Sequence, residues 1–190
     1  MAPKLILTGF MASGKSAVAR NLSRRLGWRL IDCDAAIVAR AGKPIPEIFR
    51  IHGEAHFRTL ESEVIAAVAR DSRRCAQCGN PLPAVVATGG GAIVDAENCA
   101  NLRRAGVIVC LSARPEIIAR RVGHSAKARP MLTQGGKPLH ERIAELMAAR
   151  RDAYARADVT IDTSDINIDQ VALAVLDAFA EHSRRWAASA

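Results

Sequence analysis

The stretch GFMASGKS, residues 9–16, decides the fold of this chain. A glycine, any four residues and then Gly-Lys-Ser is the spacing of a loop whose backbone N–H groups surround phosphate oxygens. The apolar run KLILT (4–8) precedes the stretch, and a helical pattern over 14–26 follows it. Strand, loop and helix therefore occur in the order that a phosphate-binding loop requires, with the positive end of the helix dipole beside the phosphate.

The rest of the chain continues this alternation of strands and helices. Short runs of apolar and β-branched residues predict strands at 4–8, 28–32, 84–91, 107–113 and 159–163. Amphipathic patterns predict one or two helices within 33–70, broken near His52-Gly53, and further helices at 14–26, 95–104, 115–122, 139–157 and 168–186. Such alternation predicts an α/β fold with a mainly parallel sheet, covered by helices on both faces.

Composition limits the class of protein. The 190 residues favour one domain, the net charge is +8, and aromatic residues make up only 4%. Few aromatic residues and dispersed arginine pairs argue against a nucleic-acid partner, so the positive charge favours small anionic substrates. The odd number of cysteines, 5, indicates reduced thiols, and no signal peptide or membrane-spanning run is visible. We therefore expect a soluble, cytoplasmic protein that binds neither nucleic acid nor membrane.

The residues of the phosphate loop indicate which ligand it binds. Lys15 is suited to reach terminal phosphates, and the Ser16 hydroxyl is suited to bind Mg²⁺. Ala12 stands where many such loops have glycine, a change that we expect to be tolerated if this residue needs no positive φ. We interpret the loop as a site for ATP with Mg²⁺, formed by Gly9, Ala12, Ser13, Gly14, Lys15, Ser16 and Ala17.

Two carboxylates, Asp32 and Asp34, stand at the end of the second predicted strand. Residues two apart on a strand face the same side, so both can point into the crevice above the sheet. One would then lie on the metal side, and the other could accept a hydroxyl proton. An Asx turn or a helix cap at the strand end explains the pair equally well.

Arginines and glycines further along have a structural and a functional interpretation. Arg58 has Glu54 and Glu61 at helical spacing, which indicates either a surface ion pair or a guanidinium held ready for a substrate carboxylate. The three glycines at 89–91 end a strand, and together they indicate that a ligand approaches the backbone. Arg150 lies on the predicted helix 139–157, directly after a long loop, where a solvated surface residue is the ordinary interpretation.

Residues 123–138 are rich in glycine, proline and basic residues. A loop of this length in a compact domain is typical of a functional lid. Arg129 within it could close over the transferring phosphates and stabilise their charge.

Together these motifs resemble those of the shikimate kinase family. The similar segments are, in order, GFMASGKS, IDCDAAI, IPEIFRIHGEAHFRTLE, ATGGGAI, ARPML and RRDAY, and they extend from about Leu5 to Thr163. Many kinases share the phosphate loop, whereas Asp-x-Asp, Gly-Glu-x-x-Phe-Arg and the triple glycine are together much more specific. The resemblance implies a three-layer α/β/α sandwich with five parallel strands in the order 2-3-1-4-5. It also implies ATP- and Mg²⁺-dependent phosphorylation of the 3-hydroxyl of shikimate, for aromatic amino-acid synthesis, and we expect a monomer.

The resemblance further implies a role for each motif residue. Asp34 would hold the acceptor hydroxyl and act as the base, and Asp32 with Ser16 would lie at the metal. Lys15 and Arg129 would neutralise charge on the phosphates. Shikimate would be bound by Arg58, Arg150, Gly89, Gly90 and Gly91, and adenine would pack on Arg121.

We accordingly expect residues 1–190 to form a single kinase domain. Its parts are a core (1–32, 84–122 and 139–190), a shikimate-binding segment (33–70), a lid (123–138) and an insertion (73–83). The insertion contains Cys75-x-x-Cys78, half of a zinc-ribbon ligand set. No second pair with ligand spacing follows, which favours a solvent-exposed loop with reduced thiols.

Two features depart from the family pattern. Arg150 is followed by Arg151, so a shift of one residue would exchange them. Ser164-Asp165 stands where some relatives have an arginine near adenine. The alternatives are a related small-molecule kinase, for example one acting on gluconate, and a non-catalytic nucleotide-binding module. The second would be expected to lose acceptor-site residues, and this chain has the complete set.

Overall fold

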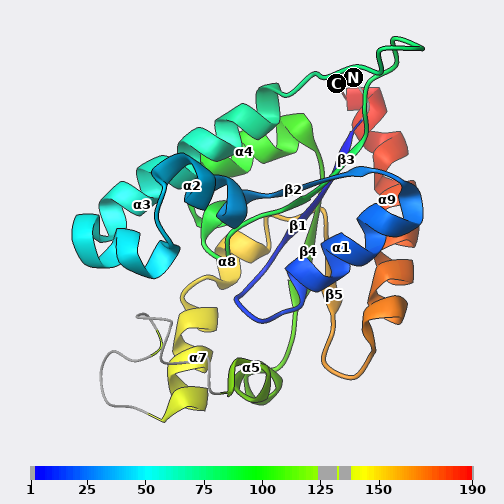
Figure 1. Ribbon diagram of the computed structural model, residues 1–190. Coiled ribbons are helices and arrows are strands. Elements are labelled where there is room, and N and C mark those ends of the chain that lie inside the picture. Colours follow the sequence, from blue (N-terminus) through cyan, green and yellow to red (C-terminus); the bar gives the residue numbers. More distant parts are fainter. Residues whose placement is uncertain (1–2, 124–131, 133–137, 190) are drawn as a thin grey trace.

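The computed structural model describes residues 3–123, 132 and 138–189, and Figure 1 shows a central sheet flanked by helices. The sheet has five strands in the order β2-β3-β1-β4-β5, and all neighbouring strands are parallel. This is the order that the resemblance implied. The strands are β1 (Lys4–Thr8), β2 (Arg29–Asp32), β3 (Ala84–Ala87), β4 (Gly106–Ser112) and β5 (Val159–Asp162).

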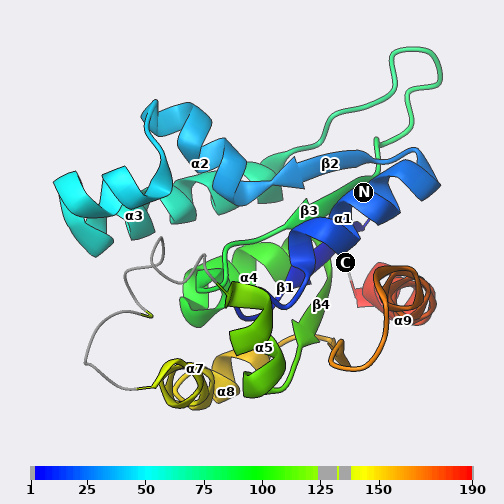
Figure 2. The same cartoon turned by 60° about the horizontal axis from the view of Figure 1, so that its bottom comes forward.

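Helices cover both faces of the sheet, as Figure 2 shows from a second direction. They are α1 (Lys15–Leu26), α2 (Cys33–Ala41), α3 (Ile45–Arg70), α4 (Ala96–Ala105), α5 (Pro115–Val122), α7 (Leu139–Ala148), α8 (Arg151–Tyr154) and α9 (Ile168–Ser189), with a 3-10 turn η1 (Ala92–Val94). Among the described residues, no helix is both long and apolar enough to cross a membrane.

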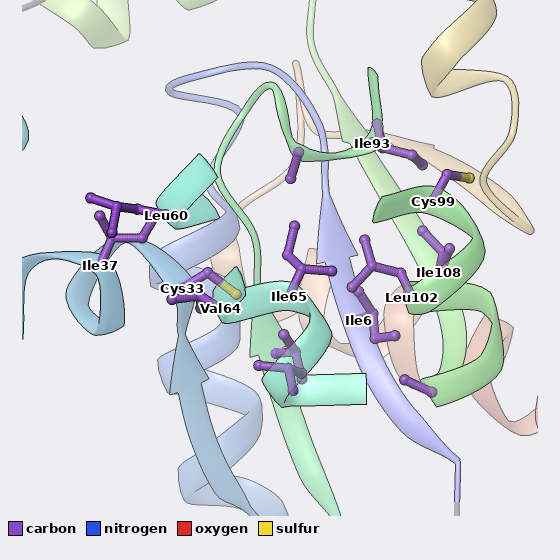
Figure 3. Close-up of a cluster of buried hydrophobic side chains, with 14 of the residues drawn as sticks. Ile6, Cys33, Ile37, Leu60, Val64, Ile65, Ile93, Cys99, Leu102 and Ile108 are labelled. Carbon is purple, nitrogen blue, oxygen red and sulfur yellow. The ribbon is translucent and has the colours of Figure 1, made fainter. Parts of the chain in front are cut away.

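Strand β1 shows why the strands are continuously apolar. Leu5 and Leu7 pack with side chains of α1 and α9, whereas Ile6 between them packs with side chains of α3 and α4. Figure 3 shows Ile6 beside Ile65 of α3 and Leu102 of α4. Since successive strand residues face opposite sides and both sides are covered, no polar alternation is tolerated in the centre of the sheet.

A third apolar cluster lies under the phosphate loop. Phe10 of that loop packs with Ile118 and Val122 of α5 and with Ile143 of α7. This cluster fixes the loop against two helices that follow β4 in the chain.

The predicted helix over 139–157 is wrong as a single element. Arg150 adopts φ −111° and ψ 5°, and it separates α7 from the short α8. The break predicted near His52-Gly53 is confirmed, because Gly53 has φ 78° and ψ 177° inside α3.

The parallel sheet brings separate sequence motifs to one edge. The loop after β1, the start of α2 after β2 and the glycines after β3 all follow the carboxyl ends of adjacent strands. In open α/β sheets this edge is where ligands bind. The candidate site is therefore built there.

Candidate functional site

The phosphate loop connects β1 to α1 and depends on two glycines. Gly9 has φ 128°, and a Cβ on it would lie 2.1 Å from the carbonyl oxygen of Leu111. Gly14 has φ 103° and is the N-cap of α1. Any other residue at position 9 would collide with the backbone of β4, so the strand next to β1 explains this glycine.

Ala12 adopts a positive φ, although its replacement of glycine was expected to be tolerated only without one. Its φ is 58°, the only positive value at a non-glycine residue in the described part of the chain. The left-handed region costs an L-residue about 1–2 kcal/mol. The alanine is therefore accommodated with strain, and the condition under which the replacement was expected to be tolerated is not met.

Lys15 is directed back over the phosphate loop. Its Nζ donates to the carbonyl oxygens of Gly9 and Phe10, each at 2.8 Å, and the residue is buried. The backbone thus holds the ammonium group at the loop, where incoming phosphate oxygens would meet it. Ser16 follows on the first turn of α1 and is exposed, so its hydroxyl is accessible.

Asp32 and Asp34 do not share a strand face as predicted. Asp32 ends β2 and is the N-cap of α2, where its Oδ1 accepts the N–H of Ala35 at 3.2 Å. The helix-cap interpretation therefore applies to Asp32. Asp34 lies in the first helical turn, and the turn of α2, rather than strand alternation, directs it to the crevice.

Three charged side chains, Asp32, Lys15 and Arg58, influence the pKa of Asp34. Burial raises the pKa of Asp34, and the neighbouring Asp32 carboxylate raises it further. Lys15 and Arg58 act in the opposite direction on the same pKa, because a nearby positive charge favours the ionised carboxylate. The structure thus brings together Asp34, the phosphate-loop lysine and Arg58.

Arg58 pairs with both of the glutamates that flank it in sequence. Its Nη1 donates to Glu61 at 2.7 Å, while Nε and Nη2 donate to Glu54 at 3.2 and 2.9 Å. The two partners differ in burial: the Glu61 side chain is 1% exposed and that of Glu54 is 54% exposed. One contact is therefore a buried anchor, and the other lies at the solvent side of the same guanidinium.

Glu61 is a site residue that sequence reasoning did not identify. Burial raises its pKa, as does the nearby Asp34 carboxylate, against the opposing effect of Arg58 and Arg150. Its Oε1 is buried without a hydrogen-bond partner among the described residues. The spacing to Arg58 was visible in the sequence, but only the three-dimensional packing shows that this glutamate, unlike Glu54, lies inside.

Each glycine of the triple faces a different part of the site. A Cβ on Gly89 would lie 2.5 Å from Oε1 of Glu61, and one on Gly91 would lie 2.6 Å from Nη1 of Arg58. A Cβ on Gly90 would lie 3.2 Å from the backbone nitrogen of Met11 in the phosphate loop. The space left by the missing Cβ atoms is thus occupied by the side chains of Glu61 and Arg58 and by the phosphate loop.

Arg150 and Tyr154 converge on the backbone of Gly90. Tyr154 donates its hydroxyl to the Gly90 carbonyl at 2.6 Å, and Arg150 Nη1 donates to the same oxygen at 3.4 Å. Burial raises the pKa of Tyr154 to about 12, which keeps this donor protonated. The Arg150 guanidinium also lies 5.8 Å from the centre of the Phe10 ring, while Arg151 is exposed. The arginine in the crevice is therefore Arg150.

Arg121 is held at the other end of the phosphate loop. It donates to the side-chain and backbone oxygens of Thr163, and the Thr163 hydroxyl contacts the Ser13 carbonyl at 3.1 Å. Nearby, Asp165 accepts two hydrogen bonds from Arg114, both at 2.7 Å. Asp165, where some relatives have an arginine, thus forms an ion pair with the N-cap residue of α5.

Part of the predicted site lies outside the described residues. Arg129 and nearly all of the predicted lid 123–138 belong to that part. In the described chain, no group of three or more His, Cys, Asp or Glu side chains could hold a metal ion. Hard oxygen donors do stand beside the phosphate loop, namely the Ser16 hydroxyl and the Asp32 carboxylate, and they fit a Mg²⁺ that is mainly held by phosphates and water.

Comparison with known proteins gives one consistent family. A family model described as shikimate kinase matches residues 11–180. The shikimate kinase of Geobacter metallireducens is 45% identical over 167 residues, which cover 88% of this chain and 86% of that protein.

Solved structures agree with this result. A shikimate kinase from Acinetobacter baumannii in complex with shikimate superimposes with a TM-score of 0.83 at 31% identity, covering 96% of this chain and 95% of that one. A gluconokinase from Sinorhizobium meliloti, at 16% identity, has a TM-score of 0.55 and covers 100% of this chain and 98% of its own. The second likeness shows a shared fold alone.

Proposed function

This chain belongs to the shikimate kinase family, and we propose how its residues carry out ATP-dependent phosphorylation of the 3-hydroxyl of shikimate. The observation that carries the proposal is the convergence of Lys15, Asp34 and Arg58 around the glycines at 89–91, which lie against Asp34 and Arg58 directly and against the Gly9 carbonyl that Lys15 contacts. A phosphate-loop cation, a buried carboxylate and a carboxylate-binding guanidinium are the groups that transfer to a hydroxy acid needs.

Arg58 and Arg150 bind the carboxylate of the acceptor in this proposal. Glu61 keeps one side of the Arg58 guanidinium fixed inside the protein. The contact with the exposed Glu54 is the one that a substrate carboxylate can replace, since little burial is lost there. A planar guanidinium favours such a two-point contact, which also sets the orientation of the shikimate ring.

Asp34 acts as the base for the acceptor hydroxyl. Its raised pKa makes the carboxylate a better proton acceptor than an exposed aspartate. Lys15, which lowers the same pKa, is then shared between the base and the phosphates, so that charge on both reacting partners is stabilised.

The phosphate loop and α1 bind the triphosphate of ATP. Lys15 would exchange its bonds with the loop carbonyls for bonds with terminal phosphate oxygens. Ser16 and Asp32 would hold Mg²⁺, which supplies charge neutralisation at the phosphates when bound. Ala12, Ser13 and Ala17 line the same turn.

Three assignments stay predictions of the sequence. Arg121, fixed by Thr163, offers one face of its guanidinium to adenine. Arg129 is assigned to the phosphates. We also propose a cytoplasmic protein whose catalytic unit is one chain; the free thiols at all five cysteines support the reducing compartment.

A coupled ADP-release assay tests the function. We expect turnover with shikimate, little turnover with gluconate, and a much higher KM for the methyl ester of shikimate, which keeps the hydroxyl groups and loses the carboxylate. Turnover of gluconate alone would support the alternative acceptor. ATP binding without turnover on either acid would support the non-catalytic module.

A further inference from the structure

The Cys75-x-x-Cys78 segment lies away from the kinase site, in a hairpin that we call the cysteine hairpin (residues 73–82). An isolated antiparallel bridge between Arg74 and Pro81 and a bond from Leu82 N to Arg73 O at 2.9 Å close its base. It precedes β3, whereas the site lies after the strands, and Figures 1 and 2 both show it projecting from the body.

The turn of the cysteine hairpin is ordered around one sulfur atom. Gly79 N donates to Cys75 O at 2.9 Å, and Gly79 has φ 69°, in the left-handed region. The Cys75 sulfur accepts the backbone N–H groups of Cys78 and Gln77 and contacts the Cys78 side chain. Two sulfur atoms therefore lie together at the tip, one of them with backbone donors aimed at it.

This arrangement of two sulfur atoms is suited to bind a soft metal ion. Zn²⁺ takes thiolates at C-x-x-C spacing, and hydrogen bonds to the coordinating sulfur orient it and stabilise its charge. Cys75 is half-buried and Cys78 exposed, so both sulfur atoms can be reached from solvent. The other three cysteines are buried in the domain and cannot join them.

One hairpin supplies only half of a structural zinc site. Such sites are four-coordinate, and the described residues contain no group of three or more metal-ligating side chains. A second copy of the hairpin offers the same two thiols, and a twofold axis through the ion would bring identical surfaces together. Because the hairpin projects from the body, two copies can meet there without contact at the kinase sites.

The charges also favour a second copy. Four thiolates around Zn²⁺ carry a net charge of −2 in formal terms. Arg74 lies across the turn, where its Nη1 donates to Gly79 O at 2.8 Å, and the side chain is exposed. One Arg74 from each copy balances that charge beside the metal.

We propose that Cys75 and Cys78 bind Zn²⁺ together with the same two cysteines of a second copy, so that the ion joins two kinase domains. The thiol protons are released to solvent on binding. The site that sequence reasoning judged incomplete is complete in the pair.

Zinc titration of the reduced, metal-free chain tests this. We expect one ion bound per two chains, a doubling of mass in light scattering, and X-ray absorption showing four sulfur ligands at about 2.3 Å. Binding of one ion per chain without a change in mass, mixed sulfur and oxygen ligands, or absence of binding would each overturn the proposal.

Variants separate the hairpin from other zinc ligands. The double substitution Cys75→Ser with Cys78→Ser should abolish both zinc binding and pairing, whereas Gln77→Ala, in the same turn, should retain both because only its backbone N–H contacts the sulfur. Kinase activity, expected to be unchanged in both variants, verifies that each is folded. Zinc-dependent pairing that survives the double substitution would refute the assignment, as would its loss in Gln77→Ala.

Discussion

The two halves of the kinase site are built in different ways. The phosphate half is one continuous stretch, residues 9–16, whose geometry comes from backbone conformation and from Gly9 packed against β4. The acceptor half gathers side chains from α2, α3 and the residue before α8 around the glycines that follow β3. The difference teaches that the first half can be recognised from local spacing, while the second depends on which side chains are buried together.

Asp34→Asn should give the largest effect and separate the halves most clearly. Without the base, we expect kcat to fall by about 10²–10⁴-fold. ADP affinity, measured by calorimetry, should stay within about twofold because the phosphate loop is untouched. Asp95→Asn, at the N-cap of α4, is the matched control and should leave kcat nearly unchanged. Near-normal turnover of Asp34→Asn would reject Asp34 as the base.

Arg58→Lys should weaken the acceptor half of the site more than the phosphate half. A lysine keeps the charge and loses the planar fork, so the KM for shikimate should rise roughly 10- to 100-fold. The KM for ATP should change little. Arg40→Lys, at the exposed ion pair with Glu63, provides the comparison. Equal losses for both substrates would contradict the assigned role.

The two glutamates beside Arg58 test the importance of burial within the acceptor half. Glu61→Gln should raise the KM for shikimate roughly tenfold, since it weakens the buried anchor of the guanidinium. Glu54→Gln should change it by no more than about threefold, and downward, because the exposed contact competes with the substrate. Steady-state kinetics of each variant give these KM values. A larger rise in KM for Glu54→Gln than for Glu61→Gln would show that burial does not decide which glutamate holds Arg58.

The pH dependence of turnover gives a further test of Asp34. Its carboxyl must be deprotonated to accept the hydroxyl proton, and burial raises its pKa from the ordinary 3.8. Activity should therefore fall, as pH is lowered, at a pH above 3.8, while ADP binding persists there. If activity instead falls only at or below the pKa of an exposed aspartate, the proposed buried environment of Asp34 is wrong.

Ala12→Gly should give the smallest effect, and it acts on the phosphate half alone. Removing the Cβ at φ 58° should stabilise the fold by about 1 kcal/mol in denaturant unfolding. The same change at Ala180, exposed within α9, should destabilise it by about the same amount. A destabilising Ala12→Gly would mean that position 12 bears no strain.

Sequence reasoning predicted the strand order and the phosphate loop because both follow from local spacing and from a family resemblance. It placed Asp34 on the wrong element, since a strand exit and a helix start look alike when the two carboxylates are two residues apart. It also missed the buried role of Glu61, because helical spacing offers Arg58 two equivalent partners. Only the packing of α3 against the glycines at 89–91 distinguishes them.

The most direct measurement is a crystal structure of this chain with ADP and shikimate. The account predicts the shikimate carboxylate within hydrogen-bonding distance of Arg58 and Arg150, and the 3-hydroxyl about 3 Å from an Asp34 oxygen. An Asp34 side chain turned away from the acceptor, or a carboxylate bound elsewhere, would contradict it.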